Sequence, residues 1–208
     1  MSLRVFAVGA HPDDIEFGMA GTMVLLGRAG CELHYMTVAN GSCGSVTANA
    51  EATVAQRGEE ARRAAARMGA TYHSPLAADI EVFYDKPLLA RMGSILRAVA
   101  PDILLLPSPH DYMEDHTNSC RLAVMAAFCR GMPNFPVDPP RPAIDRPVVL
   151  YHAQPHGHHD ALNRFCPPDF FINIDAVIEE KTNLLAEHKS QKEWLDHSQG
   201  MDAYLVTM

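Results

Sequence analysis

The chain has few cysteines, few basic residues and no long hydrophobic run. Its five cysteines are odd in number and contain no CxxC pair, a pattern typical of reduced thiols in the cytoplasm rather than of a disulfide framework. Lysine and arginine number 17 against 25 aspartate and glutamate residues, which argues against nucleic acid or an anionic membrane as the main partner. No window reaches the roughly 18 apolar residues of a membrane span, and the N-terminus lacks the apolar region of a signal peptide. We therefore expect a cytoplasmic protein.

The order of the predicted elements indicates one α/β domain over residues 1–208. We expect strands at 3–9, 31–40, 101–109 and 148–153, with shorter candidates at 70–77, 80–84 and 170–174. Helices are expected at 15–30, 50–69, 86–100, 115–131 and 175–198, and the proline-dense segment 133–147 should be irregular. Alternation of this kind predicts a Rossmann-like, mostly parallel sheet with helices on both faces.

Polar clusters follow three of the expected strands. HPDD follows the first strand, NGSCGS the second, and SPHDYMEDH follows the leucine-rich strand. Because ligand sites in such sheets lie beyond the carboxyl ends of the strands, these clusters should meet at one edge.

The first cluster holds His11, Asp13 and Asp14 around a rigid proline. It lacks the GxGxxG fingerprint of a dinucleotide site, and its carboxylates would repel phosphate. His11 and Asp14 can reach one point above the strand, where an imidazole and a carboxylate suit a divalent transition metal, and Asp13 is placed to take a proton from water. The alternative is that both aspartates merely cap the following helix.

The second cluster contains His116, which opens a helix after another strand, as His11 does. His116 is the candidate third ligand, with Asp115 as the residue that orients it. An isolated histidine of this kind is more often an ordinary surface or core residue. Its expected place beside HPDD, at the same edge of the sheet, favours the interpretation as a metal ligand.

These motifs resemble the PIG-L or LmbE-like family of zinc-dependent de-N-acetylases. The resemblance rests on HPDDIE, NGSCG, Arg57 with Glu60 before ARMG, and PHDYMEDH, and covers about residues 3–130. It implies a zinc ion, or Fe²⁺ on the same ligands, held by His11, Asp14 and His116, with Asp13 as the general base. It further implies a substrate contact for Arg57, whose alternative role is a solvated partner for a helix glutamate, and for Asp79.

The sequence departs from that family in its second motif, where Met113 stands in place of the histidine that supports the tetrahedral intermediate. Methionine cannot donate a hydrogen bond. Tyr112 is one candidate replacement, and His156, His158 and His159 of the segment after 148–153 are others. These three histidines could equally form a surface cluster.

The resemblance implies hydrolysis of the acetamide of an N-acetylglucosamine-type conjugate, a small molecule, to acetate and a free amino sugar. The alternatives are hydrolysis of another amide or of a phosphoester, and a metal-holding sugar-binding protein without turnover. Homo-oligomerisation is compatible with the sequence.

Overall fold

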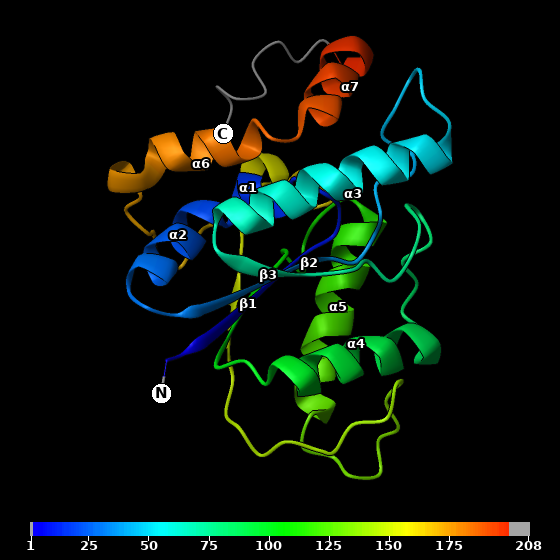
Figure 1. The fold of residues 1–208 in the computed structure, drawn as a ribbon, viewed down its shortest axis with the longest axis vertical. Helices are drawn as coiled ribbons and strands as arrows, with labels where there is room; N and C mark the ends of the chain where they lie inside the picture. The colour runs from blue at the N-terminus through cyan, green and yellow to red at the C-terminus, as the bar shows by residue number, and fades with distance from the viewer. Residues whose placement is uncertain (1, 200–208) are drawn as a thin grey trace.

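The computed structural model describes residues 2–199 and contains a five-stranded sheet between two layers of helices (Figure 1). The strands are β1 (Arg4–Gly9), β2 (Glu32–Thr37), β3 (Ala70–His73), β4 (Ile103–Leu106) and β5 (Val149–His152). Their order is β3-β2-β1-β4-β5, and every neighbouring pair is parallel. The expected Rossmann-like parallel sheet is confirmed.

Helices cover both faces of this sheet. They are α1 (Asp14–Gly18), α2 (Ala20–Arg28), α3 (Ala50–Arg67), α4 (Lys86–Val99), α5 (Glu114–Cys129), α6 (Ile178–Leu185) and α7 (Lys189–Gln199), with 3₁₀ turns η1 (His156–His158) and η2 (Asp175–Val177). Alternate residues of β1 face opposite layers: Phe6 and Val8 pack with α4 and α5, and Val5 and Ala7 with α1, α2, α3 and α6. Among the described residues, no helix is long and apolar enough to cross a membrane.

Side-chain caps fix where two of the long helices begin. The side chain of Asn49 accepts a hydrogen bond from the amide of Ala52 at 2.9 Å at the start of α3. Asp85 does the same for Leu88 at 2.8 Å at the start of α4. Each cap satisfies an amide that lacks a partner within its helix.

Two helices predicted as continuous are broken in the structure. The helix expected at 15–30 is divided at Met19, whose φ of −132° is not helical. The helix expected at 175–198 consists of η2, α6 and α7. The second break brings His188 into the interior, where its side chain is fully buried.

Two short strand predictions are wrong. Residues 80–84 form a turn and an irregular segment, because Ile80 adopts a left-handed φ of 65°. Residues 170–174 are irregular and have no partner strand, and Phe171 is 86% exposed, so this apolar run does not contribute a buried strand. The proline-dense segment 133–147 is irregular, as predicted.

The strand order reverses between β1 and β4. The chain leaves β1 to build β2 and β3 on one side, then returns to build β4 and β5 on the other. Loops after β1 and β4 diverge at such a reversal and leave room for a ligand. HPDD follows β1 and the second polar cluster follows β4.

Candidate metal centre

Three side chains from the two loops converge on one point. Donor atoms of His11, Asp14 and His116 all lie within 4.8 Å of one another. Nε2 of His116 lies 3.3 Å from Nδ1 of His11 and 3.4 Å from Oδ2 of Asp14. The structure therefore brings the three predicted metal ligands together, although they come from segments about a hundred residues apart.

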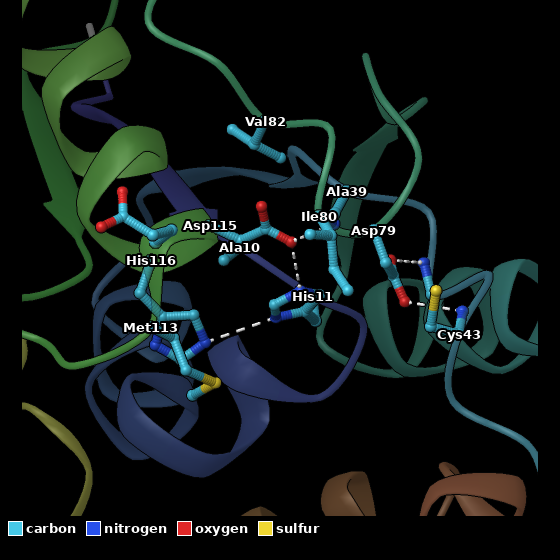
Figure 2. A network of polar contacts seen from close by, with 12 residues as sticks. Ala10, His11, Ala39, Cys43, Asp79, Ile80, Val82, Met113, Asp115 and His116 are labelled. Atoms are coloured by element: carbon cyan, nitrogen blue, oxygen red, sulfur yellow. Dashed lines mark hydrogen bonds and ion pairs between the residues drawn. The ribbon is translucent and has the colours of Figure 1, made fainter.

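A second carboxylate orients each imidazole. Nε2 of His11 lies 2.9 Å from Oδ2 of Asp115 (Figure 2). Nδ1 of His116 lies 3.0 Å from Oδ2 of Asp111. A carboxylate partner favours the proton on the nitrogen that it contacts, which leaves the other nitrogen free to bind a metal. Two neutral imidazoles and one carboxylate are a donor set that fits zinc and similar divalent ions.

The expectation that Asp115 orients His116 is wrong. Asp115 contacts His11 instead, and Asp111 is the partner of His116. The physical reason is the helix start: Asp111 lies in the turn before α5, whereas Asp115 lies within its first turn and projects toward the β1 loop.

The carboxylate of Asp14 binds the loop that precedes α1. Its Oδ2 accepts hydrogen bonds from the amides of Ala10 at 2.9 Å and His11 at 2.7 Å. Asp13 is the N-cap residue of α1, but its side chain makes no cap hydrogen bond. Side-chain capping of α1 therefore does not explain this pair of aspartates.

The electrostatics favour protons on the imidazoles when no metal is bound. Burial lowers the pKa of His116, but the charges of Asp14 and Asp111 outweigh it and raise that pKa to about 9. The pKa of His11 is also raised, because Asp115 and Asp14 outweigh burial. Metal binding must therefore displace a proton from His116.

Asp13 lies beside the metal ligands and is held by Arg57. Its backbone has a left-handed φ of 105°, a conformation that aspartate tolerates better than most residues. Nη2 of Arg57 donates to the carbonyl of Pro12 at 2.7 Å and lies 3.4 Å from Oδ1 of Asp13. Arg57 is only 2% exposed, so its interpretation as a solvated partner of a helix glutamate is wrong.

The glycine-rich loop after β2 encloses the same arginine. A Cβ atom on Gly44 would lie 2.2 Å from Nη1 of Arg57, so a side chain at this position would displace the guanidinium. The carboxylate of Asp79 accepts hydrogen bonds from the amides of Gly41 at 2.6 Å and Cys43 at 2.9 Å (Figure 2). Asp79 thus supports this loop, and a direct substrate contact by Asp79 or Arg57 stays a prediction.

The candidate replacements for the missing histidine lie at different places. Tyr112 is 59% exposed, and burial with the charges of Asp111 and Asp14 raises its pKa. The segment 156–159 reaches the site, since the backbone amide of His156 donates to Asp111. The ring of His156 packs on Phe17, with centroids 5.7 Å apart.

The other two histidines of that segment differ in their surroundings. His158 is exposed, and Nδ1 of His159 lies 2.6 Å from the carbonyl oxygen of Gly157. The ring of His159 also contacts Phe165.

A buried ion pair below the site was not predicted from the sequence. Nε2 of His188 lies 3.3 Å from Oε2 of Glu16, and both side chains are fully buried. The hydroxyl of Tyr35 also donates to Oε2 of Glu16 at 3.2 Å. Glu16 follows Asp13 by one helical turn, and this spacing could have identified Glu16 as a residue close to the site. Nothing in the local sequence marks His188.

Comparison with known proteins agrees with this geometry. Residues 6–128, more than half of the chain, match the family described as PIG-L: GlcNAc-PI de-N-acetylase. The diacetylchitobiose deacetylase of Thermococcus kodakarensis is 26% identical over 90% of this chain and 70% of its own length. The 4-oxalmesaconate hydratase of Pseudomonas putida is 28% identical over 84% of this chain and 68% of its own length.

A solved structure shares the fold. The N,N'-diacetylchitobiose deacetylase from Pyrococcus horikoshii superposes with a TM-score of 0.79 at 21% identity, over 97% of this chain and 78% of that one. With the family match over residues 6–128, the chain belongs to the PIG-L family of GlcNAc-PI de-N-acetylases.

Proposed function

We propose that this protein is a metal-dependent hydrolase that removes the acetyl group from an N-acetylglucosamine-type conjugate, giving acetate and a free amino sugar. The observation that carries the proposal is the convergence of His11, Asp14 and His116, with each imidazole oriented by its own carboxylate, beside the buried Asp13. The family match and the deacetylase relative support the same reaction. Zinc is the ion we propose, with Fe²⁺ as the alternative for these ligands.

Each residue of the site has a distinct role in the proposed reaction. A divalent ion bound by the three ligands would polarise the acetyl carbonyl and make water easier to deprotonate. Asp13 accepts the proton of the attacking water and returns it to the leaving amine. Arg57 holds the turn that carries Asp13, through the carbonyl of Pro12.

The developing oxyanion needs a donor that Met113 cannot supply. We propose Tyr112, His156 and His158 as candidates, because Tyr112 precedes Met113 and the 156–159 segment is fastened to Asp111. Arg57 and Asp79 are buried, so we propose that they act in substrate binding by holding the glycine-rich loop after β2, which would contact the substrate. Cytoplasmic location and homo-oligomerisation remain predictions.

The hydratase relative defines the main alternative reaction. Its substrate, as named, is an oxo-tricarboxylic acid, which a cation would have to bind. The guanidinium of Arg57 is 2% exposed and faces Asp13, Pro12 and Gly41, so it is poorly placed to bind such an anion. This favours a neutral acetamide as the substrate.

Acetate release tests the proposal. Protein stripped with a chelator and reloaded with zinc or Fe²⁺ would be incubated with N-acetylglucosamine, its disaccharide and its simple glycosides. We expect metal-dependent acetate and an equal amount of free amine. Sugar binding without acetate would instead favour the binding-protein alternative, and hydration of an unsaturated tricarboxylate would favour the hydratase.

A further inference from the structure

Ile80 has an unusual backbone conformation next to the metal ligands. Its φ is 65°, a left-handed value that a β-branched residue adopts only under strain. Its side chain is nevertheless 73% exposed, so burial in the core does not explain the choice of isoleucine. Strained residues of this kind persist where the surrounding structure holds them, often at functional sites.

The backbone of Ile80 is fastened directly to the metal centre. Its amide donates to Oδ2 of Asp115 at 2.7 Å, and the same oxygen lies 2.9 Å from Nε2 of His11. The amide of Val82 also donates to Asp115, and the side chain of Asn118 donates to the carbonyl of Val82 at 2.9 Å. This segment therefore keeps its place relative to His11.

Figure 2 shows the side chain of Ile80 directed toward His11, and both residues bind the carboxylate of Asp115. Tyr112 directly follows Asp111, the carboxylate partner of His116, and its side chain is 59% exposed. Two exposed side chains with apolar surface therefore lie on the segments that orient the two ligating imidazoles. Apolar surface held rigidly at a site is typical of ligand recognition.

We propose that Ile80 is a specificity-determining residue, which binds an apolar group carried by the substrate next to its amino sugar. This inference rests on the proposed deacetylase function and adds the class of aglycone to it. With Arg57 buried and facing Asp13, an anionic aglycone lacks the partner that this guanidinium could offer.

The exposure of Ile80 indicates that its side chain contacts the aglycone of the substrate and not the methyl group of the acetyl. A methyl group next to the metal would require an enclosed contact, whereas a side chain 73% exposed presents its surface to solvent at the rim. A group that extends from the sugar toward solvent would cover this surface.

The test compares the methyl and phenyl β-glycosides of N-acetylglucosamine. We expect kcat/KM for acetate release to be about tenfold higher for the phenyl glycoside, the lower end of the discrimination that a small apolar group gives in an apolar pocket. In Ile80→Asn, which accepts the left-handed backbone but presents an amide, the ratio should fall below about three. Phe128→Asn changes a similarly exposed residue at the far end of α5 and should keep the ratio.

Two further measurements separate the possible failures. Calorimetric binding of the corresponding glucosamine glycosides reports the aglycone preference without turnover, and a series of N-acyl chains reports contacts on the acyl side. Equal kcat/KM for both glycosides, or an Ile80→Asn effect confined to the acyl series, would overturn the inference while leaving the deacetylase intact. A preserved binding preference without acetate release would support the apolar site and refute the proposed reaction.

Discussion

Oδ2 of Asp115 binds two groups at once: the imidazole of His11 at 2.9 Å and the amide of Ile80 at 2.7 Å. One carboxylate therefore fixes both the tautomer of a metal ligand and the loop at its side. Asp115→Asn should lower the affinity for zinc about 10–100-fold, as is typical when the partner of a ligating histidine is changed. Competition with a coloured zinc chelator measures the affinity.

The neighbouring Glu114→Gln is the matched control, because Glu114 is exposed and lies on the same turn of α5. Equal zinc affinity in Asp115→Asn and Glu114→Gln would show that this carboxylate does not orient His11.

Asp13 should be needed for turnover and not for holding the ion. Asp13→Asn keeps the shape and removes the basicity, so acetate release should fall at least about a hundredfold. Metal analysis of the same preparation should give wild-type content. Activity within threefold of wild type would assign the proton transfer to another group.

The histidines after β5 should not be equivalent. His156→Ala should lower kcat with metal content intact, because this segment is bonded to Asp111 beside the site. His159→Ala should keep wild-type kcat, since the His159 ring lies against Gly157 and Phe165. Steady-state measurements of kcat for the two variants test this difference. Met113→His should leave kcat of the wild type unchanged, or should partly restore kcat when it is combined with His156→Ala. If His156→Ala is fully active, Tyr112 becomes the leading candidate for the donor.

Removing one partner of the buried pair of Glu16 and His188 should destabilise the protein strongly. Burial lowers the pKa of His188, but the charge of Glu16 outweighs it and the net shift is upward. His188→Gln leaves Glu16 buried without its cation and should lower the free energy of unfolding by about 3–5 kcal/mol. Urea denaturation measures this, with the exposed Lys189→Gln as control, expected within about 0.5 kcal/mol of wild type. A loss below 1 kcal/mol in His188→Gln would contradict a charged pair.

A second histidine pair predicts how stability depends on pH. Nε2 of His73 lies 3.0 Å from Nδ1 of His34, and burial with the neighbouring ring lowers the pKa of His73 from 6.5 to about 4. The unfolded chain therefore binds more protons between these values, so stability is complete above pH 6.5 and is lost as the pH falls toward 4.

Part of this effect is screened because His73 is partly exposed. We expect the free energy of unfolding to fall by about 1 kcal/mol more in wild type than in His73→Gln between pH 7 and pH 5. Denaturation curves at the two pH values give the difference, and identical pH dependence in both proteins would contradict the assignment.

The sequence predicted those features that depend on residue type and on spacing between residues close together in the chain. The parallel sheet follows from the alternation of buried strands and helices. His11 and Asp14 could be chosen because their motif directly follows a strand, and His116 because it opens the helix after another strand. Contacts set by side-chain direction could not be predicted this way. Asp115 was assigned to the wrong histidine and Asp111 was assigned to none, because which imidazole each carboxylate reaches depends on where α5 begins.

The elements that were mispredicted lack a local signal. Residues 80–84 and 170–174 have strand-like composition, but the first is held by Asp115 and the second finds no neighbouring strand. His188 meets Glu16 only through the tertiary packing of the C-terminal helices.

The most direct test of the central claim is a metal titration of chelator-treated protein, with acetate release from an N-acetylglucosamine glycoside followed at each addition. If His11, Asp14 and His116 hold one catalytic ion, the rate rises in proportion to added zinc or Fe²⁺ and saturates at one ion per chain, and His116→Ala stays inactive throughout. Acetate release that is independent of added metal, or that is unchanged in His116→Ala, would contradict the account.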